Sequence, residues 1–411
     1  MNLQSGAYYW PHTLPDPPAY PALDSDLACD VLIVGGGSSG AQSAYELAGH
    51  GLDVVLIEKG TVGSGSTSTN TALIQYSGEA MFTDLIHSFG ERYIARHLAL
   101  LQDAIDSIET ASRQLTMDVE FRRRDTLYFA SCDEDVPRLH KEYQYLKQQG
   151  CSVDFWGQEQ IEAHYPFSKQ AAIFSHNDGE LNPFKYTHAL IRDAAAKGVL
   201  VYEHTAMNGH RYDRERQEMQ VTTRNGYTIR AKHVILAAGY EGVEIRSEKQ
   251  ASFVSTYTLT TQPVDSFDFW HGRTLIWETA RPYLYLRTTA DNRAIIGGLD
   301  ENTTIAEQRD NKLHHRQQML LDALRERFPG IPFEPAYACT AFYGGTRDGL
   351  PIVGRYDDYP GCYFIFAFGD NGTVYSQALT KLIARDILDG HCPDLELYAQ
   401  DRPLLTKLIR G

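Results

Sequence analysis

The sequence has none of the long apolar runs that cross a membrane and no closely paired cysteines. A membrane-spanning helix needs roughly 18 or more apolar residues, whereas the longest apolar stretch here, residues 362–368, has the length of a buried strand. The 6 cysteines lie apart without C-x-x-C spacing, and residues 1–5 lack the charged and apolar segments of a secretory signal. We therefore expect a cytoplasmic protein with free thiols and no membrane span.

Positive charge is also scarce. The chain has 38 Lys and Arg against 53 Asp and Glu, which gives a formal net charge of -15. This balance argues against nucleic acid and anionic membrane surfaces as partners. The 15 histidines form no H-x-x-x-H pair and no cluster with cysteine, so the sequence predicts no metal site.

The most informative feature present is a glycine loop between a strand pattern and a helix pattern. Residues 29–34 form the strand, a G-x-G-x-x-G motif follows at Gly35, Gly37 and Gly40, and residues 41–50 form the helix. Gly35 permits a tight turn, Gly37 lets the backbone approach a pyrophosphate, and Gly40 allows the helix to pack closely on the strand. The pyrophosphate would lie at the positive helix N-terminus.

A second strand pattern, residues 53–57, ends in Glu58. Its carboxylate can accept hydrogen bonds from both ribose hydroxyls and would repel a 2′-phosphate. Strand, helix, strand and acid in this order predict a dinucleotide-binding unit, although the motif does not distinguish NAD from FAD. Because 411 residues are many for one domain, we expect two.

Between this unit and the C-terminus, helix and strand patterns alternate. Apolar residues at spacings of three and four predict a buried helix over residues 93–115. The strand that follows the central hairpin runs into Gly239, where a backbone could lie close to a bound nucleotide. The other predicted elements are the helix 184–197, the strand 199–203, the hairpin strands 219–223 and 227–231, and the strand 233–238.

Residues 252–298 are rich in strand patterns. Tyr283, Tyr285 and Arg287 alternate onto one face of a strand, and two leucines lie on the other face. The polar face is either a binding site or a solvated surface, and both interpretations stay open for Arg287. The next strand, residues 294–296, is expected to stop at the glycine pair after it.

Near the C-terminus, a predicted loop over residues 344–351 is followed by a strand at 363–368 and by Gly369-Asp370-Asn371-Gly372-Thr373. A helix then continues through Leu388. Unpaired amides at its N-terminus can stabilise an anionic ring such as a reduced flavin. A capped helix without a ligand is the alternative.

The first 27 residues hold 5 of the 17 prolines together with Tyr8, Tyr9 and Trp10. This composition predicts an extended arm rather than a helix or strand. We expect its aromatic side chains to pack on the body of the protein.

With these segments placed, the chain resembles the D-amino-acid oxidase superfamily of FAD-dependent oxidoreductases, whose members include glycine oxidase, sarcosine oxidase and gamma-glutamylputrescine oxidoreductase. The resemblance covers nearly the whole chain and implies FAD as the cofactor. A single G-x-G-x-x-G motif is present, so the substrate itself should donate the electrons. The matching segments are residues 34–40, 62–70, 179–183, 234–239 and 346–354 and the glycine loop before the last helix.

The resemblance implies an α/β fold, α+β overall, with a doubly wound, Rossmann-like FAD-binding domain and a substrate domain built on a large antiparallel sheet. The expected FAD-binding domain comprises residues 28–84, 170–243 and 340–391. The expected substrate domain comprises 85–169 and 244–339, and residues 1–27 and 392–411 form the N-terminal arm and a C-terminal tail. Residues expected to contact FAD are Gly35, Gly37, Ser38, Ser39, Gly40, Glu58, Lys59, Ser64, Ser66, Thr67, Asn70, Thr71, Ala72, Met207, Ala238, Gly239, Gly344, Asp348, Asn371, Gly372 and Thr373.

Departures from the family pattern concern the cofactor link. Thr69 lies in the segment where family members attach FAD through histidine. Cys339 lies near the segment where sarcosine oxidases attach FAD through cysteine, but its spacing to the Thr346–Asp348 loop is longer. We therefore expect non-covalent FAD.

Other departures concern the substrate. Tyr343, Asp370 and Val374 stand where the family's amino-acid oxidases place basic residues that bind a carboxylate. Asp370 could instead attract an ammonium group, or merely cap the last helix, and Tyr283 and Tyr285 could wall an aromatic pocket for a cation. The candidate pocket residues are Tyr257, Glu278, Tyr283, Tyr285, Arg287, Tyr343 and Asp370.

The preferred hypothesis is an FAD-dependent amine oxidase or dehydrogenase that oxidises a substrate C–N bond by hydride transfer to flavin N5, giving an imine. The electron acceptor could be oxygen, a quinone or a carrier protein. One alternative is a 2-hydroxy acid dehydrogenase with Arg287 as the carboxylate partner. The other is a flavin-holding subunit that docks on a partner enzyme.

Overall fold

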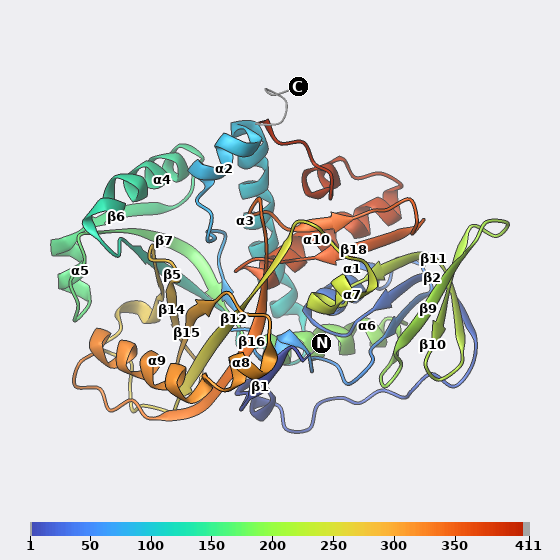
Figure 1. Cartoon of the computed structure of the whole chain (residues 1–411), viewed down its shortest axis with the longest axis horizontal. Helices are drawn as coiled ribbons and strands as arrows, with labels where there is room; N and C mark the ends of the chain where they lie inside the picture. The colour runs from blue at the N-terminus through green and yellow to red at the C-terminus, as the bar shows by residue number, and fades with distance from the viewer. Residues whose placement is uncertain (1, 406–411) are drawn as a thin grey trace.

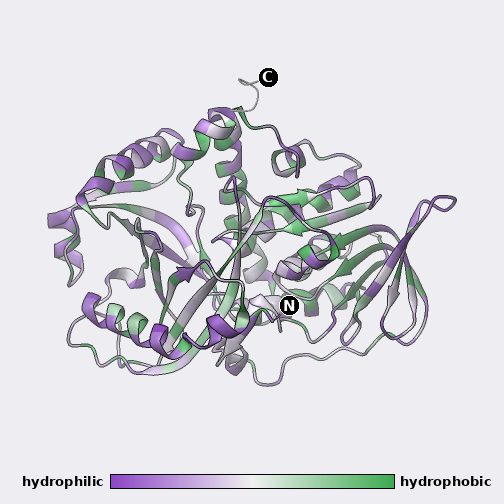
Figure 2. Cartoon of the chain, in the orientation of Figure 1, coloured by the Kyte–Doolittle hydropathy of each residue, from purple (hydrophilic) through white to green (hydrophobic). Residues whose placement is uncertain are grey.

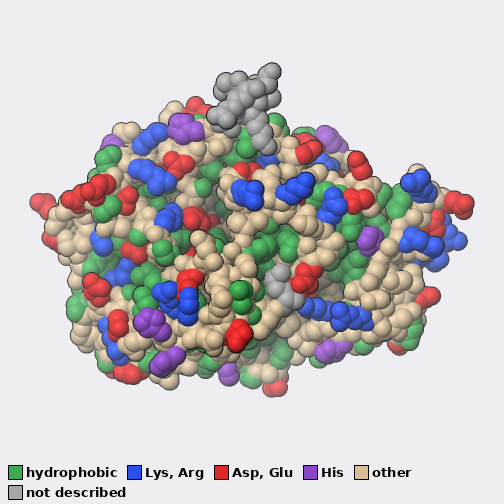
Figure 3. All heavy atoms as spheres, in the orientation of Figure 1, with side chains coloured by type: hydrophobic (Ala, Val, Ile, Leu, Met, Phe, Trp, Pro, Cys, Tyr) green, Lys and Arg blue, Asp and Glu red, His purple; other side chains and the backbone are tan. Residues whose placement is uncertain are grey.

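The structure, a computed structural model, describes residues 2–405 and contains two β-sheets joined by helices (Figure 1). An eight-stranded sheet carries the glycine loop, and a ten-stranded sheet carries the tyrosine-rich strand. The expected α/β class, with a Rossmann-like unit and a large antiparallel sheet, is confirmed. Figure 3 shows acidic and basic side chains interspersed over one face of the molecule.

The centre of the eight-stranded sheet is parallel. β2 (Leu27–Val34) pairs in parallel with β3 (Val54–Ile57) and with β11 (Thr228–Leu236). Outside these lie β8 (Leu200–Tyr202), which pairs with β3, and β18 (Cys362–Phe366), which pairs with β11; both pairings are parallel. The remaining strands are antiparallel: β17 (Ile352–Gly354), β9 (Met207–Asp213) and β10 (Glu218–Thr223).

Side chains of β2 alternate between the two faces of the sheet, and this explains the two apolar layers that pack against it. Val31 and Ile33 pack in one core with α1 (Ser38–Leu47), whereas Leu32 and Val34 pack in another with β10 and the start of β11. The apolar strands of this sheet form the green interior on the right of Figure 2. On the helical side, α1 contacts α6 (Pro183–Ala196) and α10 (Gly372–Asp389).

The ten-stranded sheet follows the order β1-β16-β12-β15-β14-β13-β5-β7-β4, with β6 paired to β7. All of its pairings are antiparallel except that of β13 with β5. Its strands are β1 (Gln4–Gly6), β4 (Leu73–Ile74), β5 (Arg122–Phe129), β6 (Val153–Gly157), β7 (Ala171–Glu180), β12 (Ala251–Thr261), β13 (Leu275–Glu278), β14 (Leu284–Thr288), β15 (Ala294–Glu301) and β16 (Pro335–Thr346).

One face of this sheet is covered by α9 (Leu313–Arg327), which contacts β12, β15 and β16 around an apolar core. The opposite face lies toward the first sheet. α3 (Glu91–Gln114) confirms the amphipathic helix expected over residues 93–115 and contacts α10. The remaining helices are α2 (Phe82–Phe89), α4 (Val136–Gln148), α5 (Gln158–His164), α7 (Gly242–Ile245) and α8 (Ala306–Asp310).

The expected extended arm is only partly correct. Residues 4–6 form strand β1, because the edge of β16 offers free backbone groups: the N–H of Phe342 donates to the carbonyl of Leu3 at 2.8 Å. A short 3₁₀ helix follows at Trp10–Thr13. Tyr9 and Trp10 are buried, which confirms that the aromatic residues pack on the body.

Three element boundaries also differ from the expectation. The strands expected at 227–231 and 233–238 are one strand, β11, because β2 pairs with it along its whole length. β15 continues past Gly297 and Gly298, since the missing side chain at Gly297 leaves room for the Tyr285 ring. The loop expected from residue 344 begins later, because β16 extends to Thr346.

The expected domain boundaries need correction as well. β4, β7 and the end of β16 fall within segments that the sequence assigned to the FAD-binding domain, yet all three belong to the ten-stranded sheet. The chain crosses between the sheets more often than local patterns indicate. The expected tail also folds, with a 3₁₀ helix at Pro393–Tyr398 and a buried Arg402, while residues 406–411 lie outside the described residues.

Within residues 2–405, no helix combines the length and the apolar character that crossing a membrane requires.

Candidate active site

A cavity of about 630 Å³ lies between the two sheets. β2, β3 and β18 contribute to one wall, β12, β14 and β16 contribute to the other, and α1 and α10 both begin beside it. The size suits a ligand-binding cavity. The expected cofactor contacts that line it are Gly35, Gly37, Ser38, Ser39, Glu58, Lys59, Ser64, Ser66, Thr67, Asn70, Thr71, Met207, Ala238, Gly239, Asn371 and Gly372.

The start of α1 forms one end of the cavity. Gly37 is the N-cap and has no side chain that could cap the amides of the first turn. The Thr67 hydroxyl accepts the Ser38 N–H at 3.0 Å. Gly40 brings the helix close to the strand, because a Cβ there would lie 1.8 Å from the carbonyl oxygen of Gly35. These features fit a pyrophosphate at the helix N-terminus.

Glu58 lies beside this end of the cavity, as expected. Its two carboxylate oxygens accept the N–H groups of Gly36 at 2.7 Å and Gly60 at 2.8 Å. A carboxylate can accept about four hydrogen bonds. Glu58 therefore keeps acceptor capacity for ribose hydroxyls, while its backbone bonds fix its position.

The start of α10 forms a second uncapped helix N-terminus on the same cavity. Its N-cap residue, Asn371, makes no side-chain capping bond and instead donates to the carbonyl of Ser77 at 2.7 Å. Asp370 precedes it, so the structure gives no support to Asp370 as the cap of this helix. Backbone N–H groups and the helix dipole at Asn371 and Gly372 fit an anionic edge of a flavin ring.

Five expected cofactor contacts do not line the cavity: Gly40, Ala72, Gly344, Asp348 and Thr373. Ala72 and Thr373 support Asn70, whose side chain accepts the Ala72 N–H at 2.7 Å and donates to the Thr373 hydroxyl at 3.0 Å. Asp348 is paired with Arg402 at 2.6 Å. Gly344 leaves room for the Tyr240 ring, which would lie 2.6 Å from a Cβ there.

Aromatic side chains gather at the part of the cavity bounded by the ten-stranded sheet. Tyr283, Tyr285 and Tyr343 line it as expected, and Trp277 lines it as well. Tyr283 and Tyr285 have ring centroids 5.7 Å apart. Burial raises the pKa of all three phenols above the ordinary value, so they stay neutral at physiological pH.

Tyr257 and Glu278 do not line the cavity, which corrects their place among the candidate pocket residues. Tyr257 is fully buried in the core beneath α9. Glu278 is paired with Arg327 at 3.0 Å. Neighbouring residues of a strand point to opposite faces, and the cavity is lined by Thr256, Thr258 and Trp277 beside them.

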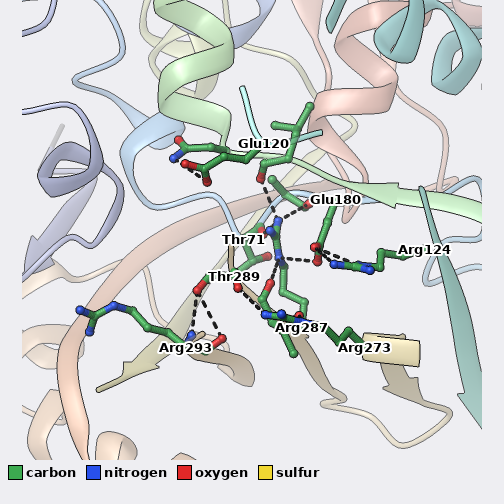
Figure 4. A network of polar contacts seen from close by, with 12 residues as sticks. Thr71, Glu120, Arg124, Glu180, Arg273, Arg287, Thr289 and Arg293 are labelled. Atoms are coloured by element: carbon green, nitrogen blue, oxygen red, sulfur yellow. Dashed lines mark hydrogen bonds and ion pairs between the residues drawn. The ribbon is translucent and has the colours of Figure 1, made fainter. Parts of the chain in front are cut away.

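Arg287 is also absent from the cavity lining, although it shares a strand face with the tyrosines. Figure 4 shows its side chain directed toward Thr71 and Glu180. Its Nη1 donates to the carbonyls of Thr71 at 3.0 Å, Ala72 at 2.8 Å and Leu181 at 2.9 Å, and its Nε lies 3.6 Å from Glu180. The guanidinium therefore bonds to groups of the protein itself. Arg287 belongs neither to a solvated surface nor to the cavity wall that a substrate would contact.

Two carboxylates line the same region. Burial, with a further contribution from Glu79, raises the pKa of Asp370 to about 7, and its Oδ2 is buried without a hydrogen-bond partner. Burial raises the pKa of Asp300 to about 6, and its Oδ1 likewise has no partner. An unpaired buried carboxylate is costly, so both groups suit a ligand that brings positive charge or hydrogen-bond donors.

Sequence reasoning missed Asp300, Trp277, Tyr240, Thr256 and Thr258, all of which line the cavity. Trp277 and Thr256 directly precede Glu278 and Tyr257, which the sequence suggested as pocket residues. Only the strand register decides which residue of each pair faces the cavity. Tyr240 directly follows Gly239, a position that could have drawn attention to it.

Thr69 and Cys339, the two positions that bear on a covalent cofactor link, both lie at the cavity. Thr69 lines the cavity, and its hydroxyl donates to Gln4 at 3.3 Å. Cys339 also lines the cavity, but burial raises the pKa of its thiol to about 11 and its Sγ lies 2.9 Å from the Thr258 hydroxyl. A neutral, hydrogen-bonded thiol is a poor nucleophile.

Known proteins are similar to this chain in sequence and in fold. A Bacillus subtilis protein named as Rieske 2Fe-2S iron-sulfur protein YhfW is 29% identical over 84% of this chain, and the chain spans 65% of the length of that relative. Gamma-glutamylputrescine oxidoreductase of Escherichia coli is 24% identical over 92% of this chain and 88% of its own length.

A solved structure, L-amino acid deaminase from Proteus myxofaciens, has the same fold with a TM-score of 0.75 at 18% identity, covering 97% of this chain and 98% of that one. The family model described as FAD dependent oxidoreductase matches residues 30–385. Since this match includes both helix N-termini and both sheets of the cavity, the chain belongs to the FAD dependent oxidoreductase family and has FAD as its cofactor.

Proposed function

We propose that the chain oxidises the C–N bond of an amine or amino-acid-like substrate with FAD as the oxidant. Family membership supports the oxidoreductase chemistry. The names of two relatives, gamma-glutamylputrescine oxidoreductase and glycine oxidase, point to amines and amino acids as the substrate class. The side chains that line the cavity indicate which substrates within that class would bind.

The observation that carries the proposal is the charge at the tyrosine-lined part of the cavity. Asp300 and Asp370 line it beside aromatic rings. Among the described residues, the cationic side chains on the cavity wall are Lys59 and Arg224. Lys59 directly follows Glu58. The backbone N–H of Arg224 donates to the carbonyl of Ala206, which precedes Met207. Both cationic residues lie at the nucleotide end, so the substrate region offers acceptors and aromatic faces to a cation.

FAD, when bound, supplies a two-electron oxidant that takes a hydride from the carbon beside the substrate nitrogen. The ammonium group of the substrate gives one proton to water, because the nitrogen lone pair has to be free when the hydride leaves the neighbouring carbon. The product is an imine, which water hydrolyses to a carbonyl compound and an amine or ammonia. Oxygen, a quinone or a carrier protein then takes the two electrons.

The residues of the chain bind, orient and exclude water. Asp370 would accept a hydrogen bond from the ammonium group and so position the C–N bond of the substrate in the cavity. The amides at Asn371 and Gly372 stabilise negative charge that develops on the ring. Tyr283, Tyr343 and Trp277 form apolar walls that keep bulk water from the reacting atoms.

The structure weakens the 2-hydroxy acid alternative. That alternative needs Arg287 as the partner of a substrate carboxylate, and Arg287 already donates to three backbone carbonyls outside the cavity. The flavin-holding subunit stays open as a proposal, because the chain spans 65% of its Rieske-named relative.

The test is anaerobic bleaching of the flavin absorbance of the purified holoprotein by a substrate panel. The panel contains primary and N-methyl amines, diamines, γ-glutamyl amines, D- and L-amino acids and 2-hydroxy acids. Bleaching by amines is the expected result. Bleaching by 2-hydroxy acids alone would overturn C–N oxidation, and bleaching by no compound would favour the flavin-holding subunit.

A further inference from the structure

A β-bulge in β15 turns Asp300 toward the cavity. Thr258 pairs with Gly297 and Tyr257 with Gly298, but Ser255 then pairs with Glu301, so β15 has one extra residue between these pairs. Leu299, within the bulge, has a φ of 58°, which is unfavourable for a residue with a large side chain. Bulges of this kind re-aim side chains and occur beside active sites.

The strand alternation shows what the bulge changes. Gly297 faces the cavity side, where the Tyr285 ring lies, and Gly298 faces the opposite side with Tyr257. Without the extra residue, position 300 would pair with Ser255 and point away from the cavity. With it, Asp300 lines the cavity beside Thr256, which lies close enough to oppose the rise in the pKa of the Asp300 carboxyl.

Asp300 and Asp370 flank one tyrosine. Both carboxylates are close enough to Tyr283 to raise the pKa of its phenol. They come from different elements, Asp300 from β15 and Asp370 from the loop before α10. The cavity thus presents two separate acceptors, each with one buried oxygen that has no partner.

We propose that Asp300 is a second cation-binding group, so that the substrate is an amine with a second positively charged nitrogen, one bound by Asp370 and the other by Asp300. This inference rests on the proposed C–N oxidation. The expected substrates are diamines and polyamines. Asp300, which the strained backbone at Leu299 holds in place, would determine this specificity.

The first experiment compares three probes of similar chain length on the holoprotein. Putrescine carries a second ammonium group, butylamine ends in a methyl group, and γ-aminobutyrate ends in a carboxylate. We expect anaerobic flavin reduction at limiting concentration to be at least roughly tenfold faster with putrescine than with butylamine, because a hydrogen bond to a charged group contributes about 1.5–3 kcal/mol. γ-Aminobutyrate should be the poorest probe. Cadaverine, with one more methylene, tests whether the distance between the two acceptors also matters.

The second experiment replaces Asp300 with Asn. D300N should lose most of the preference for putrescine, with the loss in KM or Kd rather than in the limiting rate of flavin reduction. The change in kinetics with butylamine should be several-fold smaller than the change with putrescine. The matched control is D268N, an exposed aspartate on the same domain that does not line the cavity.

Binding supplies a readout that does not depend on turnover. Titration of putrescine into the holoprotein after anaerobic reduction of its flavin, which can then accept no hydride, should perturb the spectrum of the reduced flavin with a Kd that rises in D300N and is unchanged in D268N. Unchanged flavin content and thermal midpoint in D300N show that the variant folds. If D300N loses flavin, Thr256→Val, which removes the hydroxyl beside Asp300 on the cavity wall, replaces it in the same comparison.

Different experimental results would contradict the second cation site and the proposed amine oxidation. Equal reduction by putrescine and butylamine, or a preference that D300N leaves intact, would overturn the second cation site while amine oxidation stands. Reduction by no amine, with reduction by hydroxy acids instead, would overturn the proposed function itself.

Discussion

At the scale of single residues, the site depends on two carboxylates, Asp300 and Asp370, each of which has one buried oxygen without a hydrogen-bond partner. Asp370 is the sharper example, because its pKa is raised to about 7 by burial and by Glu79, while the N–H of Glu79 and the Arg281 guanidinium act in the opposite direction. Its charge state therefore changes near physiological pH.

This gives a pH prediction for the Asp370 carboxylate. An amine substrate stays protonated up to a pH near 10, so binding improves as Asp370 loses its proton. We expect kcat/KM for a cationic amine to rise as the pH increases through about 7. D370N should lower kcat/KM by roughly tenfold or more and abolish this rise. A pH profile that is the same in D370N would remove Asp370 from substrate binding.

A second prediction concerns the glycine loop. The backbone at Gly37 has φ −82°, which valine can adopt, and a Cβ there would contact only the Thr67 hydroxyl at 3.3 Å. Gly37→Val should therefore fold but lose FAD, because the added methyl groups occupy the space of the pyrophosphate. The flavin-to-protein absorbance ratio measures the loss.

Gly157→Val is the control for that variant. Gly157 is also a helix N-cap with an extended backbone, and a Cβ there would meet nothing within 4 Å. It should keep its flavin. Full yellow colour in Gly37→Val would contradict placement of the cofactor at the start of α1.

At the scale of elements, Arg287 joins three segments that are far apart in the sequence. It connects β14 to the loop at residues 71–72 and to the end of β7, and its guanidinium lies 5.4 Å from the Trp10 ring (Figure 4). The loop it holds lies next to Asn70 and Thr71, which line the cavity. Arg287 is thus a positioning residue for the cofactor loop.

Removing this guanidinium should destabilise the protein. Arg287→Met leaves three backbone carbonyls without their donor and leaves Glu180 with Arg124 as its remaining partner. This should lower the free energy of unfolding by about 3–5 kcal/mol and raise the Kd for FAD. Urea unfolding and FAD titration measure the two effects. Arg122→Met, at an exposed arginine of β5, should change stability by roughly 0.5 kcal/mol or less. Equal stability of the two variants would rule out this role.

At the scale of the whole molecule, residues of both sheets line one continuous cavity. We propose that FAD binds in this cavity, where it would contact both sheets and stabilise their arrangement. This predicts a stability that depends on cofactor concentration.

Removal of FAD should lower the thermal midpoint, and titration should restore it. At free FAD of roughly 100 times Kd, the gain is about 2.7 kcal/mol. Differential scanning fluorimetry of the apoprotein over a range of FAD concentrations measures this gain, and Gly37→Val should show none. A midpoint that is independent of FAD would contradict a cofactor bridging the sheets.

The sequence alone determined the glycine loop, the terminal Glu58, the helix over residues 93–115 and the glycine loop before α10. These patterns are local: a tight turn, a helix N-terminus and an apolar stripe each depend on residues a few positions apart. FAD and the α/β class followed from them together with the family resemblance.

Tertiary structure alone decided which side chains reach the cavity. Tyr257 and Glu278 point away while Thr256 and Trp277 point in, because neighbouring residues of a strand face opposite sides. Arg287 shares the right face but finds backbone carbonyls beyond the cavity. Asp300 enters the cavity only through the bulge at Leu299, and the register of a strand is set by its pairing partners, which lie far away in the sequence.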